Sequence, residues 1–433
     1  MLAGCGSEDP PVAPSVNQAP TIQFTFDKLA VGTVAPVNLT VAVDDTDGDP
    51  LTVAWTVTRS GNPSGIIVGG QGTPALAWES PSVVGEDVIV ATVSDGNGGQ
   101  RSVTETLKVG TVQTADVLSS QTWIRSKSPY ILRPGGATFA VDPAAVLTVA
   151  QGVEILVDNP GLDFQVQGAL VTNGTSGAPV VLGMNSRNPS PGDWGGISAV
   201  PNGPTAPQVT LNNTTVTHAQ NAVFTTSAAD AQLDGCWISQ CSAVAILHES
   251  TGSLAVTNSA ITNNKASGIK VDGGPSGTAP ASVTIQGDSI AINGELTSPN
   301  TEAGISLIFD DPLGLAPITI SGNTISRNFV PGIALGSPAL PMALYPAIFD
   351  NNLSGNEFGK ASPPRHNLLL QLDFNANGVF ATTLDARNNW WGQPYPSPSD
   401  STFIRDTIRD RQDNPGSIGV WVLVDPWLQG LPQ

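Results

Sequence analysis

A degenerate repeat fills the second half of the chain and constrains its fold more than any other feature. Each copy holds two apolar positions five residues apart, and the copies follow at intervals of 22, 23, 29, 35 and 28 residues. In the last four copies an asparagine stands three residues after the second apolar position. A recurring unit of this length predicts stacked coils, and an asparagine at one inside corner can hydrogen-bond the coils above and below. The first apolar positions are Leu211, Leu233, Val256, Ile285, Ile320 and Ile348; the second are Val216, Ile238, Ile261, Ile290, Ile325 and Leu353; the expected ladder is Asn264, Asn293, Asn328 and Asn356.

The composition favours an all-β protein and excludes one class of partner. Charged residues make up 12% of the 433 residues, against about 25% in ordinary globular proteins. The 46 glycines and 36 prolines fit many short strands joined by turns. The formal net charge of −19 argues against nucleic acid, whose binding depends on neutralising phosphates. It is compatible with divalent cations.

Residues 17–112 predict a small β-sandwich. Segments 37–43, 51–57 and 87–93 alternate apolar and polar residues, and Asp- and Gly-rich turns separate them. We expect about seven strands in this region, with Trp55 in the core. The motifs DDTDGDPLTVAW and ATVSDGNGG resemble the Ig-like, PKD-like or cadherin-like domains of bacterial surface proteins.

Residues 113–433 resemble the right-handed parallel β-helix proteins of bacteria, which have the pectin-lyase-like fold. The resemblance rests on the coil AVLTVAQGV (145–153), the turn PGDWGGI (191–197), the asparagine column and the ending RNNWWG (387–392). It implies a solenoid whose two ends are covered, because open strand edges would pair with other chains. We expect residues 401–433 to cover the C-terminal end, with residues 404–411 as the most helix-like stretch. Cys236 and Cys241 flank a strand, so we expect no disulfide between them.

The segment from Met1 to Cys5, MLAGC, resembles the lipobox of bacterial lipoproteins. The resemblance implies that Cys5 is lipidated and that residues 1–16 are a tether, which places the protein in the bacterial cell envelope, at the outer membrane or cell surface, held by a lipid anchor. Only four residues precede Cys5, fewer than the basic and apolar parts of a signal peptide need. The alternative is a chance match.

Calcium is the one cofactor for which the sequence holds candidate ligands. Carboxylates lie close together in the acidic turn and in the later Gly-rich turn, and hard oxygen ligands of this kind suit Ca²⁺. The alternative is that these side chains only cap the backbone of their turns. The candidates are Asp44, Asp45, Asp47, Asp49 and Asp95.

Catalysis has one weak candidate site. A lyase of this fold needs a basic side chain beside carboxylates, and a glycosidase needs paired carboxylates. The outward row Thr210, Gln232, Ala255, Thr284 and Thr319 carries neither. The alternative to a catalytic cluster is a solvated loop with a surface ion pair. The candidate residues are Lys270, Asp272, Asp310 and Asp311.

These observations favour a non-catalytic role. We expect the solenoid to present an extended surface that binds a polysaccharide or a surface protein. Two alternatives remain: a polysaccharide lyase or glycoside hydrolase acting on the long-loop side, and a structural spacer or adhesin stalk. An exposed aromatic row would favour the binding role, and clustered acids beside a groove would favour the enzyme.

Overall fold

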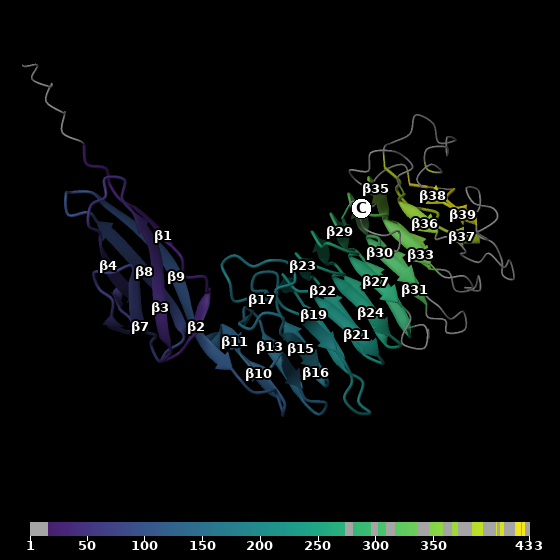
Figure 1. Ribbon diagram of the computed structural model, residues 1–433. Coiled ribbons are helices and arrows are strands. Elements are labelled where there is room, and N and C mark those ends of the chain that lie inside the picture. Colours follow the sequence, from purple (N-terminus) through teal and green to yellow (C-terminus); the bar gives the residue numbers. More distant parts are fainter. Residues whose placement is uncertain are drawn as a thin grey trace, which may run out of the picture. The chain divides into compact units, whose positions relative to one another are not determined.

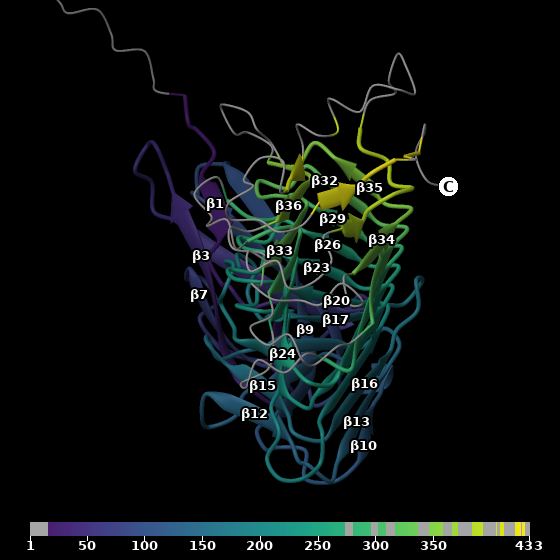
Figure 2. The same ribbon diagram turned by 90° about the vertical axis from the view of Figure 1, so that its right-hand side faces the viewer.

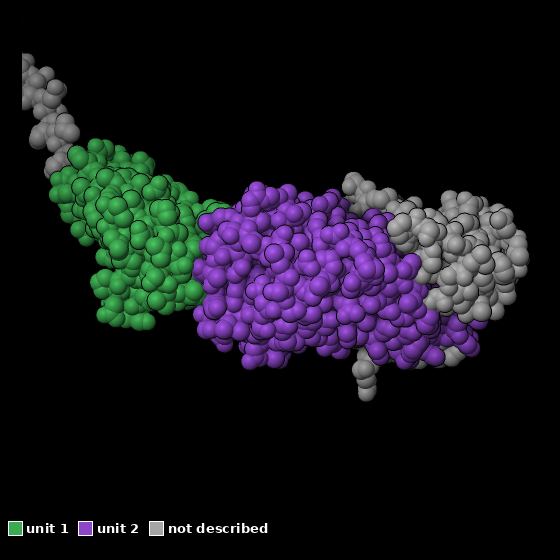
Figure 3. Space-filling view, turned by 90° about the horizontal axis from the view of Figure 1, so that it is seen from below, with its two compact units in different colours: residues 1–109 green, residues 110–433 purple. Residues whose placement is uncertain are grey.

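The structure, a computed structural model, describes residues 16–272, 280–295, 302–308, 317–336, 346–357, 366–370, 383–392, 404, 408–410, 421–425, 427 and 428. Contacts divide the chain into two units, Met1–Val109 and Gly110–Gln433, coloured separately in Figure 3. Strands and turns make up nearly all of the described residues; the helical ones are the 3-10 turn η1 at Arg125–Lys127 and Ile404. The all-β prediction is therefore confirmed.

Unit 1 is built from antiparallel strands in two sheets (Figure 1). Its alternating segments bury one face of each strand, as a half-buried antiparallel sheet requires. Trp55 is buried as predicted, together with Trp78 and Leu39. The first sheet contains β1 (Thr21–Phe24), β3 (Pro36–Asp44), β7 (Ala75–Glu79) and β6 (Ile66–Gly69), in that order; the second contains β9 (Gln100–Gln113), β8 (Gly85–Ser94), β4 (Thr52–Arg59) and β5 (Asn62–Pro63), with β2 (Ala30–Gly32) paired to β9.

Unit 2 is a stack of coils, each of which gives one strand to each of three parallel sheets. Figure 2 looks along this stack, with two of the sheets on opposite sides of it. The β10 sheet contains β10 (Gln121–Trp123), β13 (Val146–Ala150), β16 (Ala169–Asn173), β19 (Gln208–Asn212), β22 (Asp230–Asp234), β25 (Ser253–Thr257), β28 (Ser282–Gln286), β31 (Ile318–Ser321) and β34 (Ala347–Phe349).

The other two sheets follow the same coil order. The β11 sheet contains β11 (Tyr130–Leu132), β14 (Glu154–Val157), β17 (Val180–Met184), β20 (Thr214–Thr217), β23 (Trp237–Ser239), β26 (Ala260–Thr262), β29 (Ser289–Ala291), β32 (Thr324–Ser326) and β35 (Asn352–Ser354). The β12 sheet contains β12 (Thr138–Val141), β15 (Asp163–Val166), β18 (Gly196–Ala199), β21 (Val223–Ser227), β24 (Ile246–Ser250), β27 (Ile269–Asp272), β30 (Ile305–Ile308), β33 (Ile333–Gly336), β36 (Leu368–Leu370) and β38 (Ile408–Arg409).

The two apolar columns of the repeat lie in register along the interior of the stack. The first column runs through the β10 sheet, where Leu211 pairs with Leu233 and each later member pairs with the next. The second runs through the β11 sheet from Val216 to Leu353. All of these side chains are fully or almost fully buried. The repeat was therefore read in the correct register.

The predicted asparagine ladder is present. The Nδ2 atoms of Asn264, Asn293 and Asn328 donate to the Oδ1 atoms of the next asparagine at 2.9, 3.1 and 2.9 Å. Asn356 continues the series to Asn367 at 2.9 Å. These side chains are buried, and buried amides need such partners.

A second interior ladder was missed by the sequence analysis. Asn323 donates to Asn351, and Asn351 to Asn389, at 2.9 and 3.0 Å between Nδ2 and Oδ1. In the two preceding coils, Ser259 and Asp288 occupy this position. The main-chain N–H of Ser259 donates to Asp288 Oδ1, and the main-chain N–H of Asp288 donates to Asn323 Oδ1. The residues of this ladder stand two positions before the second apolar column in each coil, so their constant offset could have been recognised in the sequence.

The helix-like stretch 404–411 is described only at Ile404, which is helical, and at residues 408–410. Ile408 and Arg409 form β38 and pair in parallel with Leu368 and Leu369 of β36. The strand therefore takes up the second half of the stretch, where the ladder with β36 satisfies the backbone. β37 (Thr383–Asp385) pairs with β39 (Trp421–Leu423). Cys236 and Cys241 are buried free thiols, as expected, and burial raises the pKa of each to about 12.

Candidate functional site

Three of the five calcium candidates form a cluster in unit 1. The carboxylates of Asp45, Asp47 and Asp49 offer oxygen atoms that all lie within 4.8 Å of one another. The turn is shaped by Asp45, whose Oδ1 accepts the main-chain N–H groups of Asp47 at 2.9 Å and Asp49 at 3.2 Å. Its Oδ2 is buried and has no hydrogen-bond partner. A cation with hard oxygen ligands would fit this donor set.

Asp44 and Asp95 do not belong to that cluster. Asp44 ends β3, where it pairs with Thr21. Asp95 accepts hydrogen bonds from Asn17 Nδ2 at 2.9 Å and from the main-chain N–H groups of Asn97 and Gly99. The bond from Asn17 is the main cause that holds the pKa of Asp95 below its usual value. Asp95 thus caps its own turn, as Asp45 does, but lies outside the carboxylate cluster.

The catalytic candidates are only partly placed. Lys270 and Asp272 lie on the outer face of β27, and Lys270 Nζ is 3.3 Å from Asp272 Oδ2. Along the β12 sheet the neighbours of Lys270 are Leu247 and Ser306, neither of them ionisable. Asp310 and Asp311 lie outside the described residues. The described part of this site is therefore a partly exposed ion pair, worth about 1 kcal/mol or less.

The outward row of the β10 sheet is uncharged, as the sequence predicted. Thr210, Gln232, Ala255, Thr284 and Thr319 pair with one another in that order. Their side chains alternate with the buried apolar column. The row therefore offers hydrogen bonds but no acid–base chemistry.

The β11 sheet carries a feature that the sequence analysis did not single out. Trp237 projects from the outer face of β23, and its side chain is 56% exposed. Its neighbours along the sheet are Thr215 and Ala260. Its position between the buried Cys236 and Ile238 was a readable signal, because side chains alternate along a strand.

The turn of residues 191–197 lies against the corner that follows this face. The main-chain N–H of Gly192 donates to the carbonyl of His218 at 3.1 Å, and Trp194 Nε1 donates to the carbonyl of Thr217 at 2.8 Å. A side chain at Gly192 would collide with Ser242, which lies two coils further along the stack. Burial lowers the pKa of His218, which Asp193 partly opposes. These contacts hold the end of β20, beside β23, in a fixed place.

Comparison with family models decides the architecture. Residues 193–358 match the model of a right-handed beta helix region, and residues 9–108 match that of a bacterial Ig domain. The chain joins a bacterial Ig domain to a right-handed β-helix. Comparison with curated proteins and with solved structures finds no match.

Three surface features of the Ig domain and the β-helix offer different chemical groups to a ligand. The Ig domain offers a carboxylate cluster suited to a cation. The β12 sheet of the β-helix offers an ion pair, and its β11 sheet offers an exposed indole among hydroxyl groups. Cys5 lies outside the described residues. Among the residues that the structure describes, no helix is both long and apolar enough to cross a membrane.

Proposed function

We propose that this protein is a non-catalytic glycan-binding protein of the bacterial cell envelope, and that the outer face of the β11 sheet around Trp237 is its binding face. The observation that carries the proposal is the exposed indole of Trp237 on a regular sheet surface, where its two neighbours along the row, Thr215 and Ala260, are uncharged. An aromatic ring presents a flat apolar surface, and the C–H face of a sugar ring is apolar as well. Stacking of the two removes both surfaces from water.

The surroundings of Trp237 supply hydrogen-bonding groups. Two outward rows run along the sheet, one through Trp237 and one through Ser239. Neighbouring coils are about 4.8 Å apart, so hydroxyl groups recur at a short, regular distance. The first row holds Thr215, Trp237, Ala260, Ser289, Thr324 and Asn352, and the second holds Thr217, Ser239, Thr262, Ala291, Ser326 and Ser354.

The charges favour a neutral glycan. From Thr215 and Thr217 onward, neither row contains an ionisable residue; in the Trp237 row, Glu154 lies three coils before Trp237. The chain as a whole carries a net charge of −19, which repels polyanionic polysaccharides. A neutral polysaccharide meets neither a desolvation cost for its own charges nor this repulsion.

The backbone of the site is preorganised. Cys236 and Ile238 on either side of Trp237 are buried in the core, so the strand that carries the indole is held in place. A rigid binding face loses little entropy when a ligand docks. We further propose that a lipid on Cys5 anchors the protein, through the tether that follows, to the outer membrane or the cell surface.

The proposal is tested by binding to immobilised polysaccharides, neutral and acidic, in the presence and absence of Ca²⁺. We expect retention on a neutral glycan, and about a 5- to 150-fold loss of affinity in Trp237→Ala, if sugar stacking contributes about 1–3 kcal/mol, as stacking of a nucleic-acid base on an aromatic side chain does. Trp421→Ala is the matched control, because Trp421 is also an exposed tryptophan, at 40%, but lies on β39. If Trp237→Ala is retained as well as the parent protein, the binding face around Trp237 is ruled out.

The same samples test the alternatives. Unsaturated products or new reducing ends that disappear in Lys270→Ala would make the protein a lyase or glycosidase. The absence of both binding and turnover would favour a spacer or adhesin stalk. For the anchor, Cys5→Ser should move the protein from the membrane fraction to the soluble fraction, and an unchanged distribution would contradict lipidation.

A further inference from the structure

Strand β6 of the Ig domain has exposed apolar side chains along an open edge. Ile66, Ile67 and Val68 are 62%, 39% and 70% exposed. β7 pairs with one edge of β6, and within the described part of the chain no strand pairs with its other edge. Soluble proteins usually protect such an edge, since its unpaired backbone groups invite another strand.

The residues on both sides of β6 protect the edge of the second sheet of the Ig domain, which is formed by β4. The side-chain amide of Gln71 donates to the carbonyl of Trp55 at 2.8 Å and accepts the N–H of Trp55 at 3.0 Å. The N–H groups of Ser64 and Gly72 donate to the carbonyls of Val57 and Val53. The residues on both sides of β6 therefore cover β4, while the outer edge of β6 is left without a strand.

The charge pattern selects the kind of partner that can approach β6. Residues 60–78 contain no Asp, Glu, Lys or Arg, although the chain carries a net charge of −19. Two copies of so acidic a protein repel one another over most of their surfaces. Two copies can meet at this uncharged segment without placing like charges opposite one another. Glu79, which pairs with Ile66 from β7, is an acidic side chain at its border, one strand in from the open edge.

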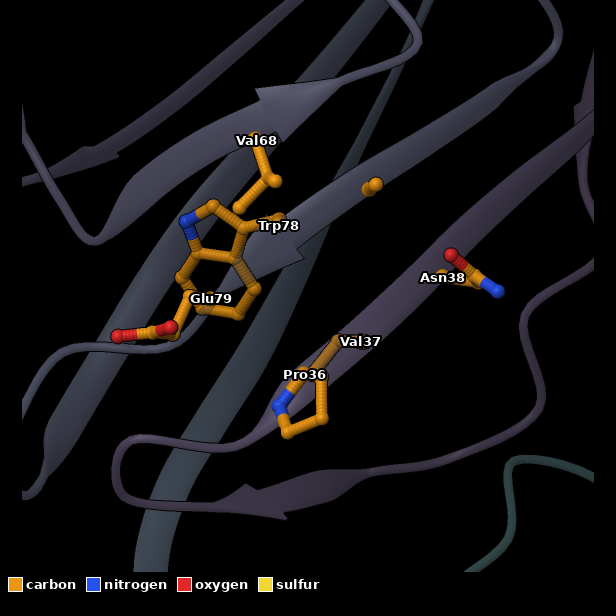
Figure 4. A pocket seen from close by; sticks show the side chains of 7 residues that line it. Pro36, Val37, Asn38, Val68, Trp78 and Glu79 are labelled. Carbon is orange, nitrogen blue, oxygen red and sulfur yellow. The ribbon is translucent and has the colours of Figure 1, made fainter.

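A hollow of about 480 Å³ borders the same strand. Figure 4 shows Val68 and Trp78 on one side of it and Pro36 and Val37 on the other. The small side chain of Ala77, which pairs with Asn38 across β3 and β7, leaves this space open. The hollow lies over β7, between β3 and β6, on the face of the sheet and not at the free edge of β6, so a strand added at that edge leaves it open.

We propose that β6 is a self-association strand, through which two copies of this protein pair their β6 strands in antiparallel fashion about a twofold axis. The pairing joins two four-stranded sheets through their open edges. A second copy is the occupant that matches this edge, because it brings an open, uncharged, apolar edge of the same length. A twofold contact of this kind is closed and stops at the dimer.

Sedimentation velocity on the full chain, with Cys5→Ser to keep it soluble, tests the proposal. We expect a reversible dimer with a dissociation constant on the order of 10 µM, because the pairing is smaller than a standard interface. Val68→Glu should weaken dimerisation by about tenfold or more, since it places like charges opposite each other. Val83→Glu is the matched control: Val83 is 66% exposed in the same domain but lies outside β6, and this variant should dimerise like the parent.

Cross-linking gives a second, independent measurement. Val68→Cys should form a disulfide-linked dimer under mild oxidation and Val83→Cys should not, while Cys236 and Cys241 are buried and do not compete. A chain that stays monomeric up to about 200 µM, well above the expected dissociation constant, overturns the proposal. So does a dimer that Val68→Glu leaves unchanged.

Discussion

The main-chain N–H of Asp288 donates to Asn323 Oδ1 at 2.8 Å, so Asp288 holds a place in the second interior ladder where the next coils have asparagine. Its Oδ1 accepts the N–H of Ser259 at 2.7 Å, but its Oδ2 is buried without a partner. The corresponding amide of Asn323 donates to Ile285 and to Asn351. A carboxylate cannot donate in this way, whereas a protonated carboxyl group can.

Asp288→Asn is therefore expected to stabilise the protein, most strongly above neutral pH. Burial raises the pKa of Asp288 to about 7, and the charge of Asp234 adds to this. The buried thiol of Cys236 is the other titratable group facing it. Because the pKa in the folded state exceeds that in the unfolded chain, the parent is most stable below about pH 4 with respect to this group and loses that stability as the pH rises through 7.

Urea unfolding at pH 5 and pH 8 measures the effect. The gain from Asp288→Asn should be about 1–3 kcal/mol at pH 8 and smaller at pH 5. Asp350→Asn is the control, because Asp350 is exposed and its φ of 56° is one that asparagine tolerates. An equal gain at both pH values would show that Asp288 is already ionised at pH 5 in the folded state, so that burial does not raise its pKa.

Asn328→Ala should destabilise the β-helix by about 2–4 kcal/mol. The side chain of Asn328 donates to the carbonyl of Ile290 and to Asn356 Oδ1, and it accepts from both the main chain and the side chain of Asn293. Alanine would leave these buried groups without partners. Thr324→Ala, at an exposed position of the same coil, should change the free energy of unfolding by less than about 0.5 kcal/mol. Equal effects of the two variants would mean that the ladder contributes little.

Calcium should raise the thermal stability of the Ig domain. A ligand present at 100 times its dissociation constant stabilises the folded state by about 2.7 kcal/mol. The shift in Tm should disappear after chelation and in Asp45→Asn, which removes the central carboxylate of the cluster. Asp44→Asn is the matched control, because Asp44 is adjacent in sequence but outside the cluster. A Tm that calcium leaves unchanged would favour the turn-capping interpretation for all five residues.

Much of the β-helix could be predicted from local spacing. The two apolar columns and the asparagine column have constant offsets within each coil, although the loops between coils vary in length. These offsets are the same in every coil because each coil must place its inward-facing residues against those of the next coil. The second ladder contains Ser259, Asp288 and Asn323, so its residue type changes from coil to coil. A pattern that requires the same amino acid in every coil does not detect it.

The sites depended on contacts that spacing does not encode. Asp45 and Asp95 each accept the N–H groups two and four residues on. Those residues are aspartates in the first turn, where they form the cluster with Asp45, whereas Asp95 also accepts a hydrogen bond from the distant Asn17. Likewise, residues 404–411 have a helical charge pattern, but the unpaired edge of β36 makes Ile408–Arg409 a strand.

The sequence by itself determined the coil, its inward-facing residues and the two-part organisation, because a periodic pattern leaves only one face to bury. The tertiary structure alone decided which outward residues are exposed and which edges are open. The exposure of Trp237 depends on the small side chains of neighbouring coils, and the open edge of β6 depends on Gln71 being engaged by Trp55. Both follow from neighbours distant in the chain, whose positions only the folded backbone specifies.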